Sequence, residues 1–417
     1  MNIKKRFDDA CEVYAEHGVD VKKAVDILKD VEISLQCWQG DDVLGFEVSE
    51  NGLSGGIMTT GNYPGRARTP EELRADLEKA FSCIPGKQRV NVHASYLESG
   101  GKFVDRDKIE TKHFQGWIDW AKEKGTALDF NTTMFSHKNA SSNYTISDYD
   151  KGIRDFWVEH GKRCRDIAEA MGKAQGSPCV LNHWMPDGCK DSNVDRYERR
   201  KLFIESMDRI LEKKISTDYV LDSLESKLFG IGVESFTVGS AETVLGYALS
   251  RNIMVTYDLG HFHPTESIAD KISSTLLYVD KLLLHTSRGV RWDSDHVVIQ
   301  SDDVFALMQE VVRANALDRV KISLDYFDAS INRVAAWVIG TRATLKALLF
   351  ALLEPVDILK EYEKEGDTTS RLALLEEYKT LPWVDVWNYF CEVCCAPIGE
   401  SWLADLKKYE NDVQMSR

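Results

Sequence analysis

Long apolar runs are missing from this chain, and no stretch approaches the roughly 18 consecutive apolar residues that suggest a membrane span. The N-terminal segment is charged and amphipathic, and it lacks the apolar core of a signal peptide. A disulfide framework is not supported either, since the nine cysteines are an odd number scattered along 417 residues. We therefore expect a cytoplasmic protein without a membrane partner.

Basic residues are also fewer than acidic residues. The chain has 52 lysines and arginines against 67 acids, which gives a formal net charge of −15 at pH 7. This balance, with no basic stripe, argues against nucleic acid and anionic membranes as partners. A glycine-rich phosphate cradle is missing as well. The expected ligand is a neutral or cationic small molecule without a phosphate group.

Separate modules are not indicated, because repeats, low-complexity segments and proline-rich linkers are absent. The only cysteine cluster consists of Cys391, Cys394 and Cys395, and it contains a CxxC spacing that can bind zinc. No second CxxC or nearby histidine completes a set of four ligands. We therefore interpret these thiols as structural or inert.

The chain does contain eight short apolar runs in which polar, aromatic or acidic residues come late. The runs are ISLQCWQ (33–39), RVNVHASY (89–96), ALDFN (127–131), SPCVLNHW (177–184), LDSLES (221–226), IMVTYDLGH (253–261), KLLLHTSR (281–288) and RVKISLD (319–325). Stretches with helical periodicity lie between them, including 70–81, 111–125 and 302–315. Alternation of strands and helices favours parallel βαβ units. Eight such units favour a closed (β/α)₈ TIM barrel over a doubly wound open sheet.

Two of these helices carry end signals. Thr69 is placed to cap the helix over 70–81, with Pro70 in its first turn and Glu72 three residues after the cap. Gly125 is suited to a left-handed stop. The N-terminal segment predicts a further helix, packed over the bottom of the barrel.

The predicted barrel occupies residues 1–330, including the N-terminal helix. Residues 331–417 predict the last barrel helix and a helical C-terminal extension in the same structural unit. Its apolar faces indicate packing against the barrel or against another subunit.

Potential metal ligands lie at or just beyond the ends of the last four apolar runs. They are Glu225, Asp258, His261, His285, Asp293, Asp295 and Asp325. In a barrel, functional side chains gather at the C-terminal ends of the strands. Seven carboxylate and imidazole ligands aimed at one place can hold two divalent cations.

Asp258 and His261 also have an ordinary interpretation. Either residue alone would more often be a helix cap or a satisfied loop residue. Gly260 between them permits a tight turn that can direct both side chains toward one cavity. His263 competes with His261 as the ligand, although its neighbours begin the next helix.

The remaining candidates also have ordinary interpretations. Asp293 and Asp295 point the same way if the segment is extended, and otherwise form a solvated acidic loop. His285 alone would be a buried, hydrogen-bonded core histidine, and its case depends on the acids that follow it. Asp325 ends an apolar run, whereas nearby Asp328 is expected to cap or orient.

Glu225 and Lys227 lie two residues apart and therefore share a face if both belong to the strand. A metal-bound carboxylate beside an ammonium group is chemically purposeful, because the ammonium can polarise a carbonyl or hydroxyl. The alternative is a simple ion pair on a solvated edge, which contributes little to stability.

Six longer strings carry a resemblance to a known family. They are CWQGDD (37–42), TGNYPG (60–65), ESKLFGIG (225–232), DLGHFHPTE (258–266), RWDSDHVV (291–298) and DYFDASINRVAAWVIGTR (325–342). These strings resemble L-rhamnose isomerase, and the resemblance runs from about Phe7 to near the C-terminus. It implies a (β/α)₈ barrel in a homotetramer that interconverts L-rhamnose and L-rhamnulose in rhamnose catabolism.

The resemblance also implies a pair of divalent metals, usually described as manganese, with zinc or cobalt as alternatives. Carried onto this chain, the catalytic metal would use His261, Asp293 and Asp295 with Glu225 bridging, and the second metal would use Glu225, Asp258, His285 and Asp325. The Glu-x-Lys element at 225–227 is also similar to that of xylose isomerases. A related barrel acting on another aldose is therefore the alternative.

Moving a carbonyl from C1 to C2 requires one hydrogen to move from C2 to C1 and one proton to move between O2 and O1. The many ligands and the missing phosphate cradle favour a metal-mediated hydride shift over a base-driven enediol route. We predict that Lys227 and one metal polarise the oxygens. A metal-bound water or hydroxide, oriented by Asp325, would relay the proton.

Trp38, His93 and Trp184 are expected to line the sugar site, because tryptophan faces suit the C–H side of a sugar and the methyl group of rhamnose. The glycine-rich stretch 40–65 predicts a long mobile loop that closes over the sugar or reaches a neighbouring subunit.

Two other classes agree less well with the sequence. A metal-dependent phosphoesterase or endonuclease would need a basic groove for its polyanion. A non-catalytic sugar-binding protein would have no use for a lysine beside seven ligands, and it would typically carry a signal sequence.

Overall fold

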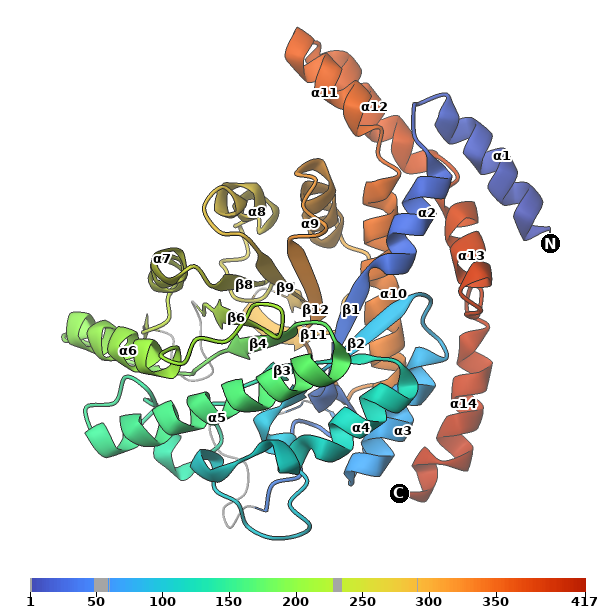
Figure 1. Cartoon of the computed structure of the whole chain (residues 1–417). Coiled ribbons are helices and arrows are strands. Elements are labelled where there is room, and N and C mark those ends of the chain that lie inside the picture. Colours follow the sequence, from blue (N-terminus) through green and yellow to red (C-terminus); the bar gives the residue numbers. More distant parts are fainter. Residues whose placement is uncertain (1, 49–58, 60, 228–234, 291) are drawn as a thin grey trace.

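Eight parallel strands close into a barrel at the centre of the molecule (Figure 1). The computed structural model describes residues 2–48, 59, 61–227, 235–290 and 292–417. The barrel strands are β1 (Glu32–Gln36), β2 (Lys87–His93), β3 (Ala127–Asn131), β4 (Cys179–His183), β6 (Val220–Glu225), β8 (Met254–Asp258), β9 (Leu282–Thr286) and β12 (Val320–Leu324). Neighbours in this series pair in parallel, and β12 pairs with β1 to close the barrel. Each strand lies within or overlaps one of the eight predicted runs, so the predicted TIM barrel is confirmed.

Helices surround the strands. After α2 (Val21–Asp30), which leads into β1, one helix follows each barrel strand: α3 (Pro70–Phe81), α4 (Gln115–Lys124), α5 (Lys151–Gln175), α6 (Arg196–Ile210), α7 (Ala241–Arg251), α8 (Ala269–Leu276), α9 (Asp302–Arg313) and α10 (Arg333–Leu352). The Thr69 hydroxyl accepts from the Glu72 amide at 3.2 Å, and Gly125 ends α4 with φ of 66°. Both predicted helix ends are confirmed.

Short strands and 3₁₀ turns lie between the main helices and strands. Two small antiparallel sheets pair β5 (Gly188–Cys189) with β7 (Phe236–Thr237) and β10 (Arg288–Val290) with β11 (Trp292–His296). Single 3₁₀ turns are η1 (Cys37–Gly40), η2 (Ala94–Tyr96), η3 (Arg106–Lys108), η4 (Thr111–Phe114), η5 (Lys138–Ala140), η6 (Tyr378–Thr380) and η7 (Gln414–Ser416). The middle of the predicted 40–65 loop, residues 49–58 and 60, lies outside the described residues.

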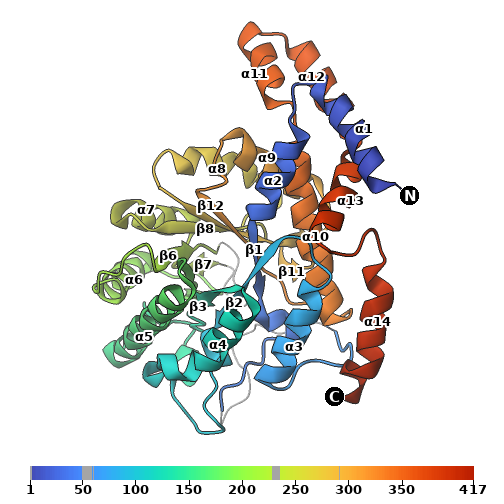
Figure 2. The same ribbon diagram turned by 45° about the vertical axis from the view of Figure 1, so that its right-hand side comes forward.

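The C-terminal extension is helical, as predicted. It comprises α11 (Val356–Glu365), α12 (Thr368–Glu377), α13 (Trp383–Val393) and α14 (Trp402–Asp412). Helices α13 and α14 run along the side of the molecule beside α10, while α11 and α12 form a hairpin that extends beyond it (Figure 2).

The N-terminal helix α1 (Ile3–Ala15) packs mainly against α13, and Phe7 stacks on Tyr389 with ring centroids 3.7 Å apart. The prediction that this helix covers the bottom of the barrel was therefore wrong. The amphipathic pattern of α1 predicts a buried face, but that face packs against α13 of the C-terminal extension.

Helix α10 is the one helix in the described ranges that is long and apolar enough to cross a membrane, with a mean hydropathy of 1.4. It does not contain the roughly 18 consecutive apolar residues that suggest a membrane span, because Arg342 and Lys346 interrupt the run. In addition, 89% of the 18-residue window with this hydropathy is buried inside the structure. Its apolar residues pack in the protein core, as those of a central helix do.

The barrel interior at the N-terminal end of the strands is occupied by structural side chains. Arg89 donates to both carboxylate oxygens of Asp129, at 3.0 and 2.9 Å. Apolar side chains from the next strands form a cluster beside this ion pair: Val180, Leu221, Met254 and Leu283. Chemistry is therefore expected at the opposite end of the barrel, where the loops that follow the strands meet.

Close packing leaves no room for a side chain at one glycine of a helix, and this predicts the effect of a substitution on stability. A Cβ added at Gly172 of α5 would lie 2.0 Å from the Tyr219 carbonyl oxygen. We expect Gly172→Ala to lower the free energy of unfolding by about 1–3 kcal/mol, since the backbone must shift. Gly246 of α7 has no atom within 4 Å of an added Cβ, so Gly246→Ala should instead stabilise by about 0.5–1 kcal/mol. Thermal unfolding midpoints of the two variants measure this contrast, and equal midpoints would contradict the argument.

Candidate metal centre and substrate cavity

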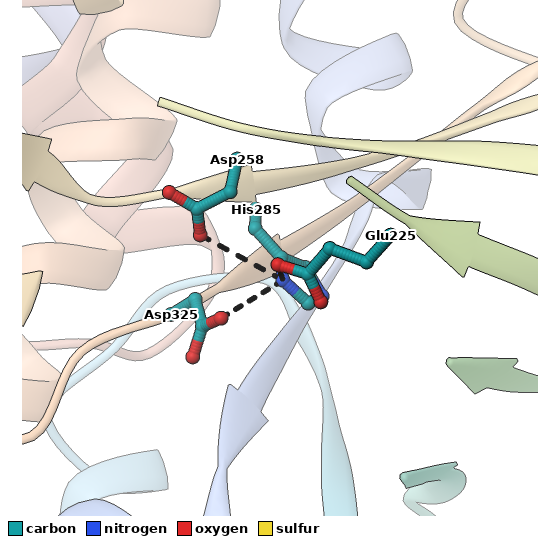
Figure 3. Close-up of side chains that lie close together, drawn as sticks. All are labelled: Glu225, Asp258, His285 and Asp325. Atoms are coloured by element: carbon teal, nitrogen blue, oxygen red, sulfur yellow. Dashed lines mark ion pairs between the residues drawn. The ribbon is translucent and has the colours of Figure 1, made fainter. Parts of the chain in front are cut away.

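Four buried side chains converge at the C-terminal end of the barrel (Figure 3). Glu225 and Asp258 are the last residues of β6 and β8, His285 lies near the end of β9, and Asp325 directly follows β12. One ligand atom from each of the four lies within 4.8 Å of the others. The four side chains come from adjacent parallel strands, and the barrel therefore brings them together.

The hydrogen bonds of this cluster leave several polar atoms without a partner. Asp258 Oδ1 accepts hydrogen bonds from the Gly260 amide at 2.6 Å and from the Ser287 hydroxyl at 2.9 Å. Within the cluster, no hydrogen bond of good geometry reaches Glu225 Oε1, Asp258 Oδ2, Asp325 Oδ1 or either ring nitrogen of His285, although His285 Nδ1 lies within ion-pair distance of Asp325. Buried polar atoms are rarely left unpaired. Three carboxylate oxygens and an imidazole nitrogen facing one point match the ligand preferences of a divalent cation.

The charges of the cluster are strongly coupled. His285 Nδ1 lies 2.9 Å from Asp325 Oδ2, 3.4 Å from Glu225 Oε1 and 3.8 Å from Asp258 Oδ2. Burial opposes a charged imidazole, but Glu225 and Asp325 outweigh it and raise the pKa of His285 well above its usual value. Three carboxylates around one imidazole leave net negative charge, which a cation would neutralise.

The two other pKa shifts follow from the same arrangement. Burial would raise the pKa of Glu225, but the imidazoles of His285 and His261 lower it below its usual range. Burial raises the pKa of Asp258 to about 7, with the negative charges of Asp325 and Glu225 acting in the same direction and His261 opposing. A carboxyl whose pKa is raised by burial and by neighbouring carboxylates is typical of a functional site.

His261 lies beside the cluster. Its Nδ1 bonds to the Ser226 carbonyl oxygen at 2.9 Å and lies 3.1 Å from Glu225 Oε1. A histidine that donates one ring nitrogen to a carbonyl directs the other toward a metal or substrate. The competing His263 is exposed and bonds to Thr265 at 2.7 Å, away from the cluster.

The second predicted acidic pair lies on β11. Asp295 lines the same cavity as Glu225 and Asp325, and its backbone has a φ of 43°. Asp293 belongs to the extended strand, but its side chain lies outside the described residues. Asp328, the competitor of Asp325, accepts from the Ser330 amide and hydroxyl at 2.7 and 2.6 Å, as a turn-orienting residue does.

Lys227 lies beyond the end of β6, which stops at Glu225. The interpretation of these two residues as neighbours on one strand was therefore wrong, because the chain leaves the sheet between them. Both nevertheless line the same cavity, and Lys227 Nζ lies 5.0 Å from the centroid of the Trp184 ring. The lysine is buried and its ammonium is held over an aromatic face.

A small cavity opens at the mouth of the barrel. Its lining residues are Trp38, Asn131, Phe135, Trp184, Glu225, Lys227, His261, Asp295, Asp325 and Phe327. Aromatic rings thus face a polar edge of carboxylates, a lysine and a histidine. This combination suits a small ligand with both C–H and hydroxyl surfaces.

The predicted substrate residues occupy two layers. Trp38 and Trp184 line the cavity, and Trp38 is held by a bond from its Nε1 to the Tyr326 carbonyl oxygen at 3.1 Å. His93 lies next to Trp38, with ring centroids 4.2 Å apart, and bonds to Gln36 Oε1 at 2.9 Å. It is fully buried and is not among the residues that line the cavity.

Two aromatic lining residues were not predicted. Phe327 follows Asp325 by two residues and contacts Trp38 edge-on, with ring centroids 5.1 Å apart. Phe135 contacts Trp184 in the same way at 5.5 Å. The signal for Phe327 was its position two residues beyond a ligand, whereas Phe135 lies four residues after β3 and gave no comparable signal.

The fold and the site together define a (β/α)₈ barrel with a buried metal-binding cluster and an aromatic-walled cavity at the C-terminal ends of its strands. Comparison with known proteins makes this class specific. The family described as L-rhamnose isomerase (RhaA) matches residues 1–417. The chain therefore belongs to the L-rhamnose isomerase family, as its sequence strings indicated.

Individual relatives agree with this assignment. The chain is 56% identical over 416 residues to the L-rhamnose isomerase of Rhodopirellula baltica, covering 100% of this chain and 97% of the relative. It is 54% identical over 417 residues to that of Bacteroides thetaiotaomicron, covering 100% and 99%. The L-rhamnose isomerase of Listeria monocytogenes is 52% identical over 415 residues, with the same coverage of 100% and 99%.

Proposed function

We propose that this enzyme interconverts L-rhamnose and L-rhamnulose. The observation that carries the proposal is the buried cluster of Glu225, Asp258, His285 and Asp325 at the barrel mouth, in a chain that matches the family along its whole length. The aromatic-walled cavity beside the cluster supports a small, unphosphorylated sugar as the ligand.

Two divalent ions, with manganese as the first candidate and zinc or cobalt as alternatives, would be held at this site. The unpartnered atoms of Glu225, Asp258, His285 and Asp325 support one ion. His261, Asp295 and Glu225 border the same cavity and would hold the other together with Asp293. Such ions, when bound, polarise the carbonyl and hydroxyl oxygens of the sugar as Lewis acids.

The side chains of the cavity would perform the remaining steps. Lys227 places a positive charge beside the sugar oxygen on which negative charge develops, where a preorganised donor is most effective. Asp325, at the polar edge of the cavity, orients the group that carries the proton between O1 and O2. The hydrogen on C2 then moves directly to C1.

The aromatic residues would position the sugar and keep out bulk water. Trp38 and Trp184 offer flat apolar surfaces to the C–H face and to the deoxy methyl group of rhamnose. His93 supports Trp38 from behind and fixes the ring that the sugar contacts. Exclusion of water strengthens the electrostatic interactions between the site and the sugar oxygens.

We further propose that the barrel (1–330) and the C-terminal region (331–417) act as one structural unit in a cytoplasmic homotetramer. The exposed hairpin of α11 and α12 supports an intersubunit role, since no residue of α12 is buried in the described chain. All nine cysteines are free thiols, in agreement with a reducing compartment.

Ketose formation tests the proposed function directly. Purified protein is supplied with Mn²⁺ and a panel of aldoses, and ketose is measured with a coupled assay. L-rhamnose should give the highest kcat/KM of the panel. A higher value for another aldose would instead support the related activity of a xylose-isomerase-like barrel, and no ketose from any aldose would refute both.

Solvent deuterium distinguishes the hydride shift from the enediol route. We expect isomerisation in heavy water to leave little or no deuterium on C1 of the ketose, because a directly transferred hydrogen never meets solvent. Mass spectrometry and proton NMR of the product measure this incorporation. Near-stoichiometric deuterium at C1 would show that a base exchanges the proton with solvent, and the proposed mechanism would be wrong.

A further inference from the structure

Asn182 lies on β4, one residue before its end, and is completely buried. Its side-chain amide donates from Nδ2 to Glu225 Oε2 at 2.5 Å. Its carbonyl oxygen accepts from the Thr256 hydroxyl at 2.8 Å, and that hydroxyl lies 2.6 Å from the Ser223 hydroxyl. Three polar side chains from β4, β6 and β8 thus form a buried chain that ends on Glu225.

The direction of every hydrogen bond in this chain is determined. Thr256 uses its only hydroxyl hydrogen on Asn182, so Ser223 must donate to Thr256. A reversed amide would place its carbonyl oxygen against the Glu225 carboxylate, where two acceptors repel each other. The amide group of Asn182 therefore always presents a donor to Glu225.

This contact divides the two oxygens of the Glu225 carboxylate between two tasks. Oε2 is occupied by Asn182, whereas Oε1 has no hydrogen-bond partner and lies 3.1 Å from His261 Nδ1 and 3.4 Å from His285 Nδ1. Oε1 is therefore the oxygen that lies between the cluster and His261. Rotation of the carboxylate would move this oxygen away from both imidazoles.

We propose that Asn182 is a positioning residue that fixes the Glu225 carboxylate for metal binding, and that Thr256 and Ser223 hold Asn182 in turn. The inference rests on the proposed function in taking Glu225 as a metal ligand. Outer-shell hydrogen bonds of this kind orient a ligand and raise its affinity for metal, and their loss typically costs about 10- to 100-fold in affinity.

The test measures metal affinity instead of turnover. The full-length protein is stripped of metal and titrated with Mn²⁺ alone, by calorimetry or by electron paramagnetic resonance of the free ion. Asn182→Leu removes both hydrogen bonds with a side chain of the same branching, and we expect its Mn²⁺ dissociation constant to rise by about 10- to 100-fold. Thr256→Val keeps Asn182 but removes the hydrogen bond to the Asn182 side-chain carbonyl oxygen. The Mn²⁺ dissociation constant of this variant should rise by a smaller factor.

Asn91→Leu is the matched control. Asn91 is equally buried on β2, and among the described residues it bonds to none of the four cluster members. The Mn²⁺ affinity of Asn91→Leu should stay within about twofold of that of the parent. This control shows whether replacing a buried asparagine in the barrel interior lowers the affinity by itself. Thermal unfolding of each metal-free variant separates loss of stability from loss of affinity.

The double variant decides whether the residues act as one chain. If Thr256 acts through Asn182, Thr256→Val should add nothing to the effect of Asn182→Leu, so the two effects are not additive. Unchanged Mn²⁺ affinity in Asn182→Leu would overturn the proposal. If that variant does not fold, unchanged affinity in Thr256→Val would overturn it. The titration contains no sugar, so its result does not depend on whether the protein isomerises L-rhamnose.

Discussion

Asp325→Asn should lose nearly all isomerase activity and bind less metal, whereas Asp328→Asn should retain both. Asp325 is buried within the cluster, and its Oδ2 lies 2.9 Å from His285. Asp328, three residues later, uses its carboxylate to accept hydrogen bonds from Ser330. The two substitutions remove one negative charge each from the same segment, so the comparison isolates the role of the metal-binding cluster.

Chelation extends this prediction to the whole site. Removal of the metal should lower kcat by at least about 1,000-fold, which corresponds to about 4 kcal/mol of transition-state stabilisation. Adding Mn²⁺ or Co²⁺ to the stripped protein should restore turnover. Elemental analysis of the same samples provides the control, and full activity in protein shown to be free of metal would refute a metal-dependent mechanism.

The barrel could be predicted from sequence because its strands are buried on both faces and therefore appear as short continuous apolar runs. The helix ends at Thr69 and Gly125 were predictable for local reasons, since capping depends on residues within one turn. The position of α1 was not predictable. Its pattern shows that Phe7 is buried, but Tyr389, on which it stacks, is nearly the whole chain away.

The metal-binding cluster was predictable for a related reason. In a parallel barrel, the ends of neighbouring strands meet, so Glu225, Asp258, His285 and Asp325 had to approach one another once the strands were placed correctly. The hydrogen bond from Asn182 to Glu225 depends on which strands are neighbours and on their register. A single asparagine in an apolar run carries no sign of either.

Lys227 illustrates the limit of reasoning from periodicity. The two-residue spacing from Glu225 predicted a shared face on a continuous strand, but β6 ends at Glu225. The lysine still lines the cavity, and its ammonium nitrogen lies 5.0 Å from the centroid of the Trp184 ring. Contacts made after a strand ends are set by tertiary packing, which the local pattern does not contain.

Lys227→Met should keep the fold and the bound metal but lose most of kcat. If the ammonium stabilises the charge that develops on a sugar oxygen, removal of this preorganised group should lower kcat by about 100- to 1,000-fold. Methionine retains the length and apolar stem of the side chain and can still pack on Trp184. The measurement is kcat with L-rhamnose, with the metal content determined on the same sample.

Lys271→Met provides the matched control for this substitution. Lys271 also places its ammonium over an aromatic ring, 4.7 Å from the Phe262 centroid, but it does not line the cavity. Its loss should leave kcat within a few-fold of the parent, since the partly exposed ion pair with Glu266 and the contact with Phe262 both lie outside the cavity lining. If Lys227→Met retains its metal and turns over at a near-normal rate, Lys227 has no part in the chemistry. If activity falls only in proportion to lost metal, its role is to support Glu225 at the metal site.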